Sequence, residues 1–277
     1  MGEFFRLKDS EFQEAHDYAK RHMSACFFIM QGFYKKNGER QEHLDAATTY
    51  YIYREQGVLK GIVYVNKSKV LFPFFESEKA YQKMDLLKII KYHQPAIIRG
   101  TTLVIDAIYR IIERVMPLYQ HKDLILMDYR GDILHGHVDY VTGGEIDFNK
   151  AVDFLISAEQ AFSRNPLSIN QLKIKIGDTR LKNRYYFLLE EDRVVAQGLV
   201  EFCYEGEMLV GGIYTHPKRR QQGYGEQMSI LLTQMAMAED KTPYLIVEKK
   251  NHSAVNLYHK IGYREVEAYE ELILAKI

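Results

Sequence analysis

Apolar and polar positions divide the chain into short segments that show either a strand period or a helix period. Residues 49–65 carry apolar and aromatic side chains on both sides of Gln56-Gly57, a pattern that predicts a β-hairpin. The rest of the first half predicts helices over 10–33, 78–93 and 102–115, and strands over 69–75, 96–98 and 123–129. The last helix has one apolar face, formed by Val104, Ala107, Ile108, Ile111, Ile112 and Val115.

The second half repeats this mixture of elements. A helical period marks residues 148–162, and strands are expected over 185–191, 193–204, 207–215 and 244–248. A further helix is expected after Gly225, because apolar residues recur there at helical spacing: Met228, Leu231, Leu232 and Met235. Both halves together predict an α/β fold in which a mixed sheet is flanked by helices.

The chain is longer than a usual single domain, so its 277 residues predict two domains. Residues 131–144 hold several glycines and no sustained period. We therefore place the boundary in this segment, with one domain over 1–134 and the other over 135–277.

A weak internal repeat connects the two halves. Two tyrosines, a charged turn and a Gly-Ile-Val triplet over residues 50–63 correspond to two tyrosines, a charged turn and a Gly-Leu-Val triplet over 185–200. The repeat has two explanations, a duplicated fold or the general likeness of amphipathic hairpins.

Composition excludes several classes of function. Lys and Arg total 37 and so do Asp and Glu, so no net field attracts nucleic acid or an anionic membrane. No stretch approaches 18 uncharged apolar residues, and no signal segment opens the chain, so we expect a cytoplasmic protein without membrane spans. Cys26 and Cys203 have neither a CxxC partner nor histidines at ligand spacing, which predicts no disulfide and no metal site.

Residues 211–237 read as a strand, a glycine-bearing turn and a helix. Pro217 ends the strand because it cannot donate a ladder hydrogen bond. Gly223 and Gly225 let the backbone of the turn approach a ligand closely, and the helix N-terminus favours an anion such as a pyrophosphate. The candidate anion-binding residues are Arg219, Arg220, Gln221, Gln222, Gly223, Tyr224 and Gly225. A simple tight turn is the alternative, and a nucleotide-hydrolysing P-loop is disfavoured because Glu226-Gln227 replaces Lys-Ser/Thr.

A second segment, residues 244–263, follows the pattern N-x-x-A-x-x-L-Y-x-x-x-G-F/Y with Asn251, Tyr258 and Tyr263 at its polar and aromatic positions. Together with the RxxGxG turn, it resembles the Gcn5-related N-acetyltransferase (GNAT) family. The resemblance implies the GNAT acyl-CoA fold in the second half, with acetyl-CoA as cosubstrate. The internal repeat extends this expectation to a tandem arrangement whose first half is a degenerate copy.

The resemblance also implies roles for single residues. Backbone groups of Ile213, Tyr214 and Thr215 would bind the pantetheine arm and hold the thioester carbonyl. Tyr258 would give a proton to the departing thiolate, and its alternative is an aromatic packing residue. Asn251 would contact the CoA arm or cap the following helix.

The resemblance does not identify a residue as the general base. Family members often use a glutamate on the central strands, but residues 211–215 contain no carboxylate. Glu201 and Glu248 are the nearest candidates, and each is equally compatible with a solvated strand-edge charge. We hypothesise that no single base is essential and that a chain of water molecules carries the proton away.

The resemblance implies an N-acetyltransferase that moves an acetyl group to a primary amine of a small molecule or peptide by direct attack in a ternary complex. The alternative is a CoA-sensing or regulatory module with weak turnover, suggested by the missing strand glutamate. The first half lacks a second glycine in its Arg99-Gly100 segment, so little CoA binding is expected there. Exposed strand edges often pair between subunits, which makes a homodimer an arrangement to test.

Overall fold

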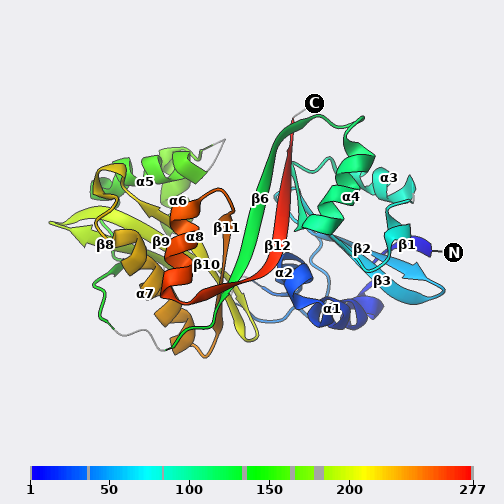
Figure 1. The fold of residues 1–277 in the computed structure, drawn as a ribbon, viewed down its shortest axis with the longest axis horizontal. Helices are drawn as coiled ribbons and strands as arrows, with labels where there is room; N and C mark the ends of the chain where they lie inside the picture. Colours follow the sequence, from blue (N-terminus) through cyan, green and yellow to red (C-terminus); the bar gives the residue numbers. More distant parts are fainter. Residues whose placement is uncertain are drawn as a thin grey trace. The chain divides into compact units, whose positions relative to one another are not determined.

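The computed structural model describes residues 2–35, 38–82, 84–132, 136–162, 166–177 and 184–275. The chain forms two compact units (Figure 1). The first unit contains Met1–Leu126, Ile246–Asn251 and Glu265–Ile277, and the second contains Met127–Leu245 and His252–Arg264. The predicted boundary between residues 134 and 135 falls on positions outside the described residues and stays a prediction.

The first unit contains a mixed sheet with strand order β1-β2-β3-β4-β5-β12. All neighbours are antiparallel except β4 and β5, which are parallel. Its strands are β1 (Gly2–Arg6), β2 (Thr49–Glu55), β3 (Val58–Val65), β4 (Val70–Phe75), β5 (Ile97–Thr101) and most of β12 (Tyr263–Leu274). Its helices are α1 (Phe12–Arg21), α2 (Met23–Met30), α3 (Met84–His93) and α4 (Thr102–Ile112). β6 (Leu118–Tyr129) begins in this unit.

The predicted hairpin is confirmed, and its turn explains the register. Gln56 and Gly57 both have positive φ, 49° and 82°, as the two central residues of a type I′ turn require. The single helix predicted over 10–33 is wrong. It is two helices that meet at His22, whose φ of −112° and ψ of 40° break the helical path. Val115 was also misplaced, because α4 ends at Ile112 and Val115 is 44% exposed.

Apolar side chains fill both faces of the first unit's sheet. Residues of α3 and α4 such as Leu86, Ile90 and Ile108 form one core with β4 and β5. Helices α1 and α2 bring an aromatic layer to strands of the sheet, in which the rings of Phe28 and Phe72 stack 5.7 Å apart. These interactions fix α1 and α2 on the sheet.

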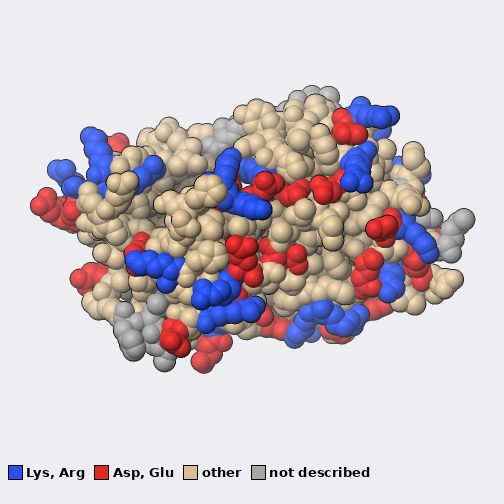
Figure 2. Space-filling view, in the orientation of Figure 1, with Lys and Arg blue, Asp and Glu red and all other residues tan. Residues whose placement is uncertain are grey.

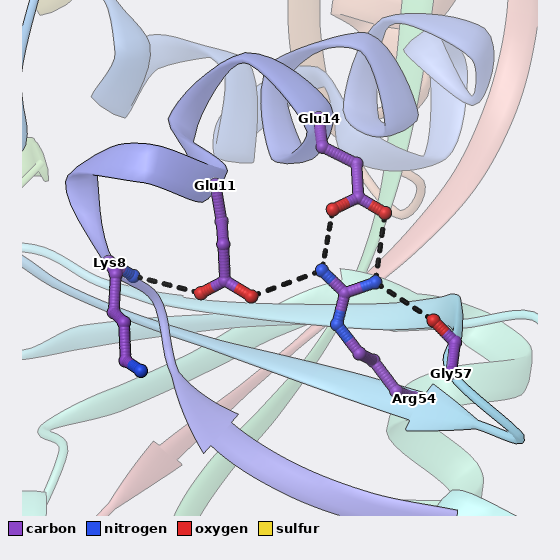
Figure 3. A network of polar contacts seen from close by, with 5 residues as sticks. All are labelled: Lys8, Glu11, Glu14, Arg54 and Gly57. Atoms are coloured by element: carbon purple, nitrogen blue, oxygen red, sulfur yellow. Dashed lines mark hydrogen bonds and ion pairs between the residues drawn. The ribbon is translucent and has the colours of Figure 1, made fainter.

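A polar network joins α1 to the first hairpin (Figure 3). The Arg54 guanidinium donates to both carboxylate oxygens of Glu14, at 2.8 and 2.5 Å, and to Glu11 at 3.2 Å. Arg54 also donates to the carbonyl of Gly57 at 3.1 Å, and Glu11 accepts from the backbone of Lys8. The hydrogen bond from Arg54 is the main cause that holds the pKa of Glu14 below its ordinary value.

We expect Arg54→Met to destabilise the protein by roughly 1–2 kcal/mol at pH 7, because Glu14 is half exposed and such pairs contribute modestly. Since the pKa of Glu14 is lowered in the folded state, this contribution is present above its ordinary pKa of 4.5 and disappears as the pH falls through the lower folded value. Urea unfolding at pH 7 and at about pH 3 measures the difference. If Arg54→Met lowered the free energy of unfolding equally at both pH values, the Arg54–Glu14 ion pair would not be the cause of the destabilisation.

The second unit contains a sheet with strand order β7-β8-β9-β10-β11. The neighbours are antiparallel except β10 and β11, which are parallel. Its strands are β7 (Val141–Thr142), β8 (Tyr185–Glu190), β9 (Arg193–Tyr204), β10 (Glu207–Thr215) and the start of β11 (Thr242–Glu248). Its helices are α5 (Phe148–Phe162), α6 (Ile169–Gly177), α7 (Tyr224–Ala238) and α8 (His252–Ile261).

Helices pack on the second sheet through the predicted apolar positions. Phe154 and Leu155 of α5 form a core with Leu172 of α6 and Phe187 of β8. From α7, Met228, Leu231 and Leu232 are buried, and Met235 is partly exposed. A Cβ on Gly198 of β9 would lie 2.8 Å from side-chain atoms of Met228 and Leu232, so this glycine permits the close packing of α7.

The two units share one plan, which confirms the predicted mixed sheet with flanking helices. In each, antiparallel strands lead to a parallel pair, β4-β5 or β10-β11, and a helix follows each strand of that pair. The counterpart of the β10-to-α7 turn is therefore the β4-to-α3 segment. The Arg99-Gly100 segment, which was compared with that turn in the sequence, instead precedes α4 and corresponds to the end of β11.

Charge is dispersed on the molecular surface. On the face drawn in Figure 2, Lys and Arg lie among Asp and Glu without forming a broad basic area. Among the helices of the described residues, none is long and apolar enough to cross a membrane.

Candidate active site

The strand-turn-helix predicted over 211–237 is present in the second unit. β10 ends at Thr215, Pro217–Arg219 form one 3₁₀ turn, and α7 begins at Tyr224. Gly223 is the residue before the helix and has φ of 86°, a conformation that residues with a side chain rarely adopt. The glycine therefore sets the direction in which the helix leaves the turn.

The amide groups at the start of α7 can bind an anion. Gln227 is the first residue whose N–H bonds back into the turn, donating to the carbonyl of Gly223 at 3.0 Å. The N–H groups of Tyr224, Gly225 and Glu226 have no acceptor within the helix, as at every helix N-terminus. The partial positive charge of this terminus favours a phosphate.

Few protein atoms lie beside the two glycines of the turn. A Cβ on Gly223 would meet only the Gln227 Nε2 atom, at 4.0 Å, and one on Gly225 would lie 3.5 Å from the Thr215 Oγ1 atom. Neither glycine is therefore required by packing within the protein. Their common property is to leave the amides accessible, which is what a bound phosphate requires. We call residues 219–225 the cradle.

Both cradle arginines already have local partners. Arg219 pairs with the carboxylate of Glu190 at 2.5 Å, and Tyr224 donates to the same carboxylate at 2.8 Å. This hydrogen bond raises the pKa of Tyr224. Arg220 donates to the carbonyl of Thr215 at 3.4 Å and lies over the ring of Tyr214. Glu190, at the end of β8, thus anchors two cradle side chains and was not identified from the sequence.

The end of β10 departs from regular pairing where the backbone was predicted to bind the pantetheine arm. Its register with β9 shifts between Gly211 and Tyr214, so Gly212 and Ile213 form an irregularity. Gly212 has φ of 58°, and its carbonyl accepts from the Gln197 side chain at 3.4 Å. In the described residues, the ladder to β11 covers only Glu207–Leu209. The strand end is therefore left with backbone groups for a ligand.

Side chains at this strand end point into different surroundings. The Tyr214 hydroxyl forms a 2.6 Å hydrogen bond with Ser157 of α5, and its ring contacts Phe154. Thr215 stands beside the cradle, because its hydroxyl oxygen would be in van der Waals contact with a side chain at Gly225. Tyr214 therefore contributes a packed side chain and leaves its backbone as the group available for binding.

Tyr258, the predicted proton donor, lies on α8 and is nearly buried. Its ring is 9% exposed and contacts Tyr263 with centroids 5.9 Å apart. Burial raises the pKa of Tyr258 to about 12. In the described part of the chain, no hydrogen bond uses its hydroxyl, whereas the Tyr263 hydroxyl pairs with Thr233 at 2.8 Å. Lys260 of α8 binds Glu226 at 2.7 Å, which holds α8 to the first turn of α7.

Glu248 has basic partners that make it a weak base. It lies with Asn251 in the segment assigned to the first unit, where its carboxylate pairs with Lys122 at 2.8 Å and Lys250 at 3.1 Å. Burial alone would raise its pKa, but the hydrogen bonds and charges of the two lysines outweigh this and lower it. Asn251 donates its backbone N–H to the carbonyl of Glu248 at 2.8 Å, directly before α8.

Glu201 lies beside the strand irregularity. It is exposed on β9, and its Oε1 atom would clash with a Cβ placed on Gly211, so its carboxylate lies against the backbone of β10. Burial raises the pKa of nearby Tyr185, and the charge of Glu201 adds to this effect. Of the two candidate bases, Glu201 is the one assigned to the same unit as the cradle.

Comparison with known proteins identifies the family that part of the chain matches. Residues 153–263, which include the cradle and Tyr258, match the model of the acetyltransferase (GNAT) family. The chain carries a domain of the GNAT family. No relative was found among curated protein sequences.

Solved structures extend the GNAT fold to the whole chain. A GNAT-family acetyltransferase from Colwellia psychrerythraea is 11% identical, covers 99% of this chain and 100% of its own, and has a TM-score of 0.61. A GCN5-related N-acetyltransferase from Sphaerobacter thermophilus is 12% identical, covers 100% and 97%, and has a TM-score of 0.66. A tandem GNAT protein from the clavulanic acid biosynthesis pathway is 9% identical, covers 98% of both chains, and has a TM-score of 0.54.

The predicted family and tandem fold are thereby confirmed. The GNAT family implies acyl transfer of the N-acetyltransferase type, generally from an acyl-CoA.

Proposed function

We propose that the protein transfers an acetyl group from acetyl-CoA to a primary amine of a small molecule or peptide, by direct attack within a ternary complex. The observation that carries this proposal is the cradle: a helix N-terminus preceded by Gly223 at positive φ, directly after a strand end whose ladder to β11, in the described residues, stops at Leu209. A pyrophosphate on the cradle and a pantetheine arm along Ile213–Thr215 use these two features together.

The chain's own residues would then bind and move protons. Amides of the cradle hold the diphosphate, and backbone groups at the end of β10 orient the thioester carbonyl. The thioester supplies an activated acyl group. Tyr258, kept neutral by burial, donates its proton to the departing sulfur. The acceptor amine must also lose a proton, which requires a base or a water molecule near the irregularity at Gly212 and Ile213, where Glu201 lies.

Release of CoA thiol from acetyl-CoA, measured over a panel of amino acids, peptides, polyamines and aminoglycosides, tests the proposal. We expect turnover with at least one amine and an acetylated product by mass spectrometry. Tight acetyl-CoA binding with no acetylated product from any amine would favour the second candidate, a CoA-binding regulatory module. The observation behind that candidate is that Glu248, one of two possible bases, is held in ion pairs.

Neither glutamate is expected to be essential for turnover. We expect Glu201→Gln and Glu248→Gln each to lower kcat/KM by no more than about 10-fold relative to the parent protein. Loss of an essential general base would lower it by about 10²–10⁴-fold. The pH profile should follow the ionisation of the acceptor amine in both variants. Loss of all turnover in Glu201→Gln, with folding and acetyl-CoA binding intact, would instead make Glu201 the base.

We propose that the first unit does not bind CoA in the same way. The β4-to-α3 segment has no RxxGxG sequence, and its described residues Glu76–Gln82 contain no glycine. The parallel strands also stay close beyond their last ladder pair, since a Cβ on Gly100 of β5 would lie 3.2 Å from the carbonyl of Pro73 in β4. One acetyl-CoA per chain is the expected stoichiometry.

A further inference from the structure

Three potential metal ligands converge in the first unit, and none of them is a residue predicted for acyl transfer. His121 and Asp123 lie two residues apart on β6 and therefore project from the same face of that strand. Glu270 of β12 meets them, with its Oε2 atom 2.7 Å from the His121 Nε2 atom. One donor atom from each residue lies within 4.8 Å of the others.

In the described residues, the basic partner of this cluster is His121, which forms a pair with Glu270. Glu270 is only 7% exposed, and its cross-strand neighbour on β5 is Gly100, which offers no side chain. In the described part of the chain, neither Asp123 nor Glu270 pairs with Lys or Arg. Lys122 projects from the opposite face of β6 and is paired with Glu248. A nearly buried carboxylate beside a second one favours a bound cation.

We propose that His121, Asp123 and Glu270 bind a divalent transition-metal ion of the zinc class. Imidazole nitrogen with two carboxylate oxygens is a donor set that suits Zn²⁺, whose ligand distances are about 2.0–2.2 Å. Ligands around such an ion lie about 3.3 Å apart, between the 2.7 Å contact and the 4.8 Å span present here. His121 and Asp123 are exposed, so their side chains can rotate to this spacing, and water completes the coordination.

The ion would fasten the carboxy-terminal strand to the first unit. His121 and Glu270 are 149 residues apart in the sequence, so a shared ion closes a long loop. Because folding assembles the ligands, binding of the metal stabilises the folded state.

Calorimetric titration of Zn²⁺ into the full-length, tag-free protein, after dialysis against a chelator, tests the site. We expect about one ion per chain and a higher melting temperature in its presence. His121→Gln and Asp123→Asn replace exposed side chains. Each should weaken Zn²⁺ binding by more than the roughly 10–100-fold lost when a group that only hydrogen-bonds to a metal ligand is removed. Co²⁺ as a second probe should give visible absorption bands that both variants lose.

His137→Gln is the matched control, because His137 and Asp139 form an exposed pair at 2.9 Å with only two donors. It should bind Zn²⁺ as the parent protein does. Absence of stoichiometric binding, or equal affinity in His121→Gln and the parent protein, would overturn the proposal and leave His121–Glu270 as a simple ion pair.

Discussion

Tyr258→Phe should lower kcat by about 10²–10⁴-fold and leave the affinity for acetyl-CoA nearly unchanged, since it removes a proton donor and keeps the ring. The hydroxyl makes no hydrogen bond in the described part of the chain, so its loss leaves no buried partner unsatisfied. Because the pKa of Tyr258 is raised to about 12, the donor stays protonated throughout the accessible pH range. Activity of the parent protein should therefore show no alkaline loss from this group below about pH 10.

The adjacent Tyr263 provides the control for this experiment. Its ring contacts Tyr258, but its hydroxyl is bound to Thr233, and the family pattern admits Phe at its position. Tyr263→Phe should cost on the order of 1 kcal/mol of stability and change kcat by only a few fold. Steady-state thiol release and calorimetry with acetyl-CoA separate the two effects. An equal fall in kcat for both variants would show that packing of the aromatic pair, and not proton donation, is what the site requires.

The local periodicity of apolar residues predicted most helices and strands. It could not predict which strands pair across long separations in the sequence. The second-unit helix over 148–162 and the strands over 193–204 and 207–215 have the predicted bounds because their periodicity is unbroken. β12 was missed, since the pairing of Leu272 with Ile98 has no local signal. α6 was missed because it buries only Leu172 and Ile176. The interruption at His22 is not visible in the helical period of 10–33, and the two helices that it separates each contact a strand of the sheet.

The candidate site was predictable where it is made of consecutive residues. The positive φ of Gly223 and the start of α7 follow from a strand, a proline and two glycines in a short segment. Glu190 was not predictable, because it reaches Tyr224 across 34 residues of sequence and looks like any strand-end charge. The lowered pKa of Glu248 likewise depends on Lys122, a residue of a distant strand.

Replacing both cradle glycines by aspartate should abolish acetyl-CoA binding in calorimetry, with a loss of at least about 100-fold, or about 2.7 kcal/mol. Two negative side chains would then occupy the space beside amides that otherwise face a diphosphate, and hydrogen bonds to charged groups contribute about 1.5–3 kcal/mol each. In Gly223→Asp the positive φ adds roughly 1 kcal/mol of strain to the folded protein. The effect on binding must therefore be separated from the effect on folding.

A control with the same change in charge and backbone strain makes that separation. Gly57 has φ of 82° and Gly206 lies in the β9-β10 turn, and a Cβ added at either glycine would have no atom within 4 Å. The double variant Gly57→Asp, Gly206→Asp should lose a similar amount of stability and still bind acetyl-CoA like the parent protein. If both double variants bound equally well, the diphosphate would not rest on the helix N-terminus, and the whole assignment of the cradle would have to be abandoned. Failure of the parent protein itself to bind acetyl-CoA would leave the GNAT fold without its usual cosubstrate.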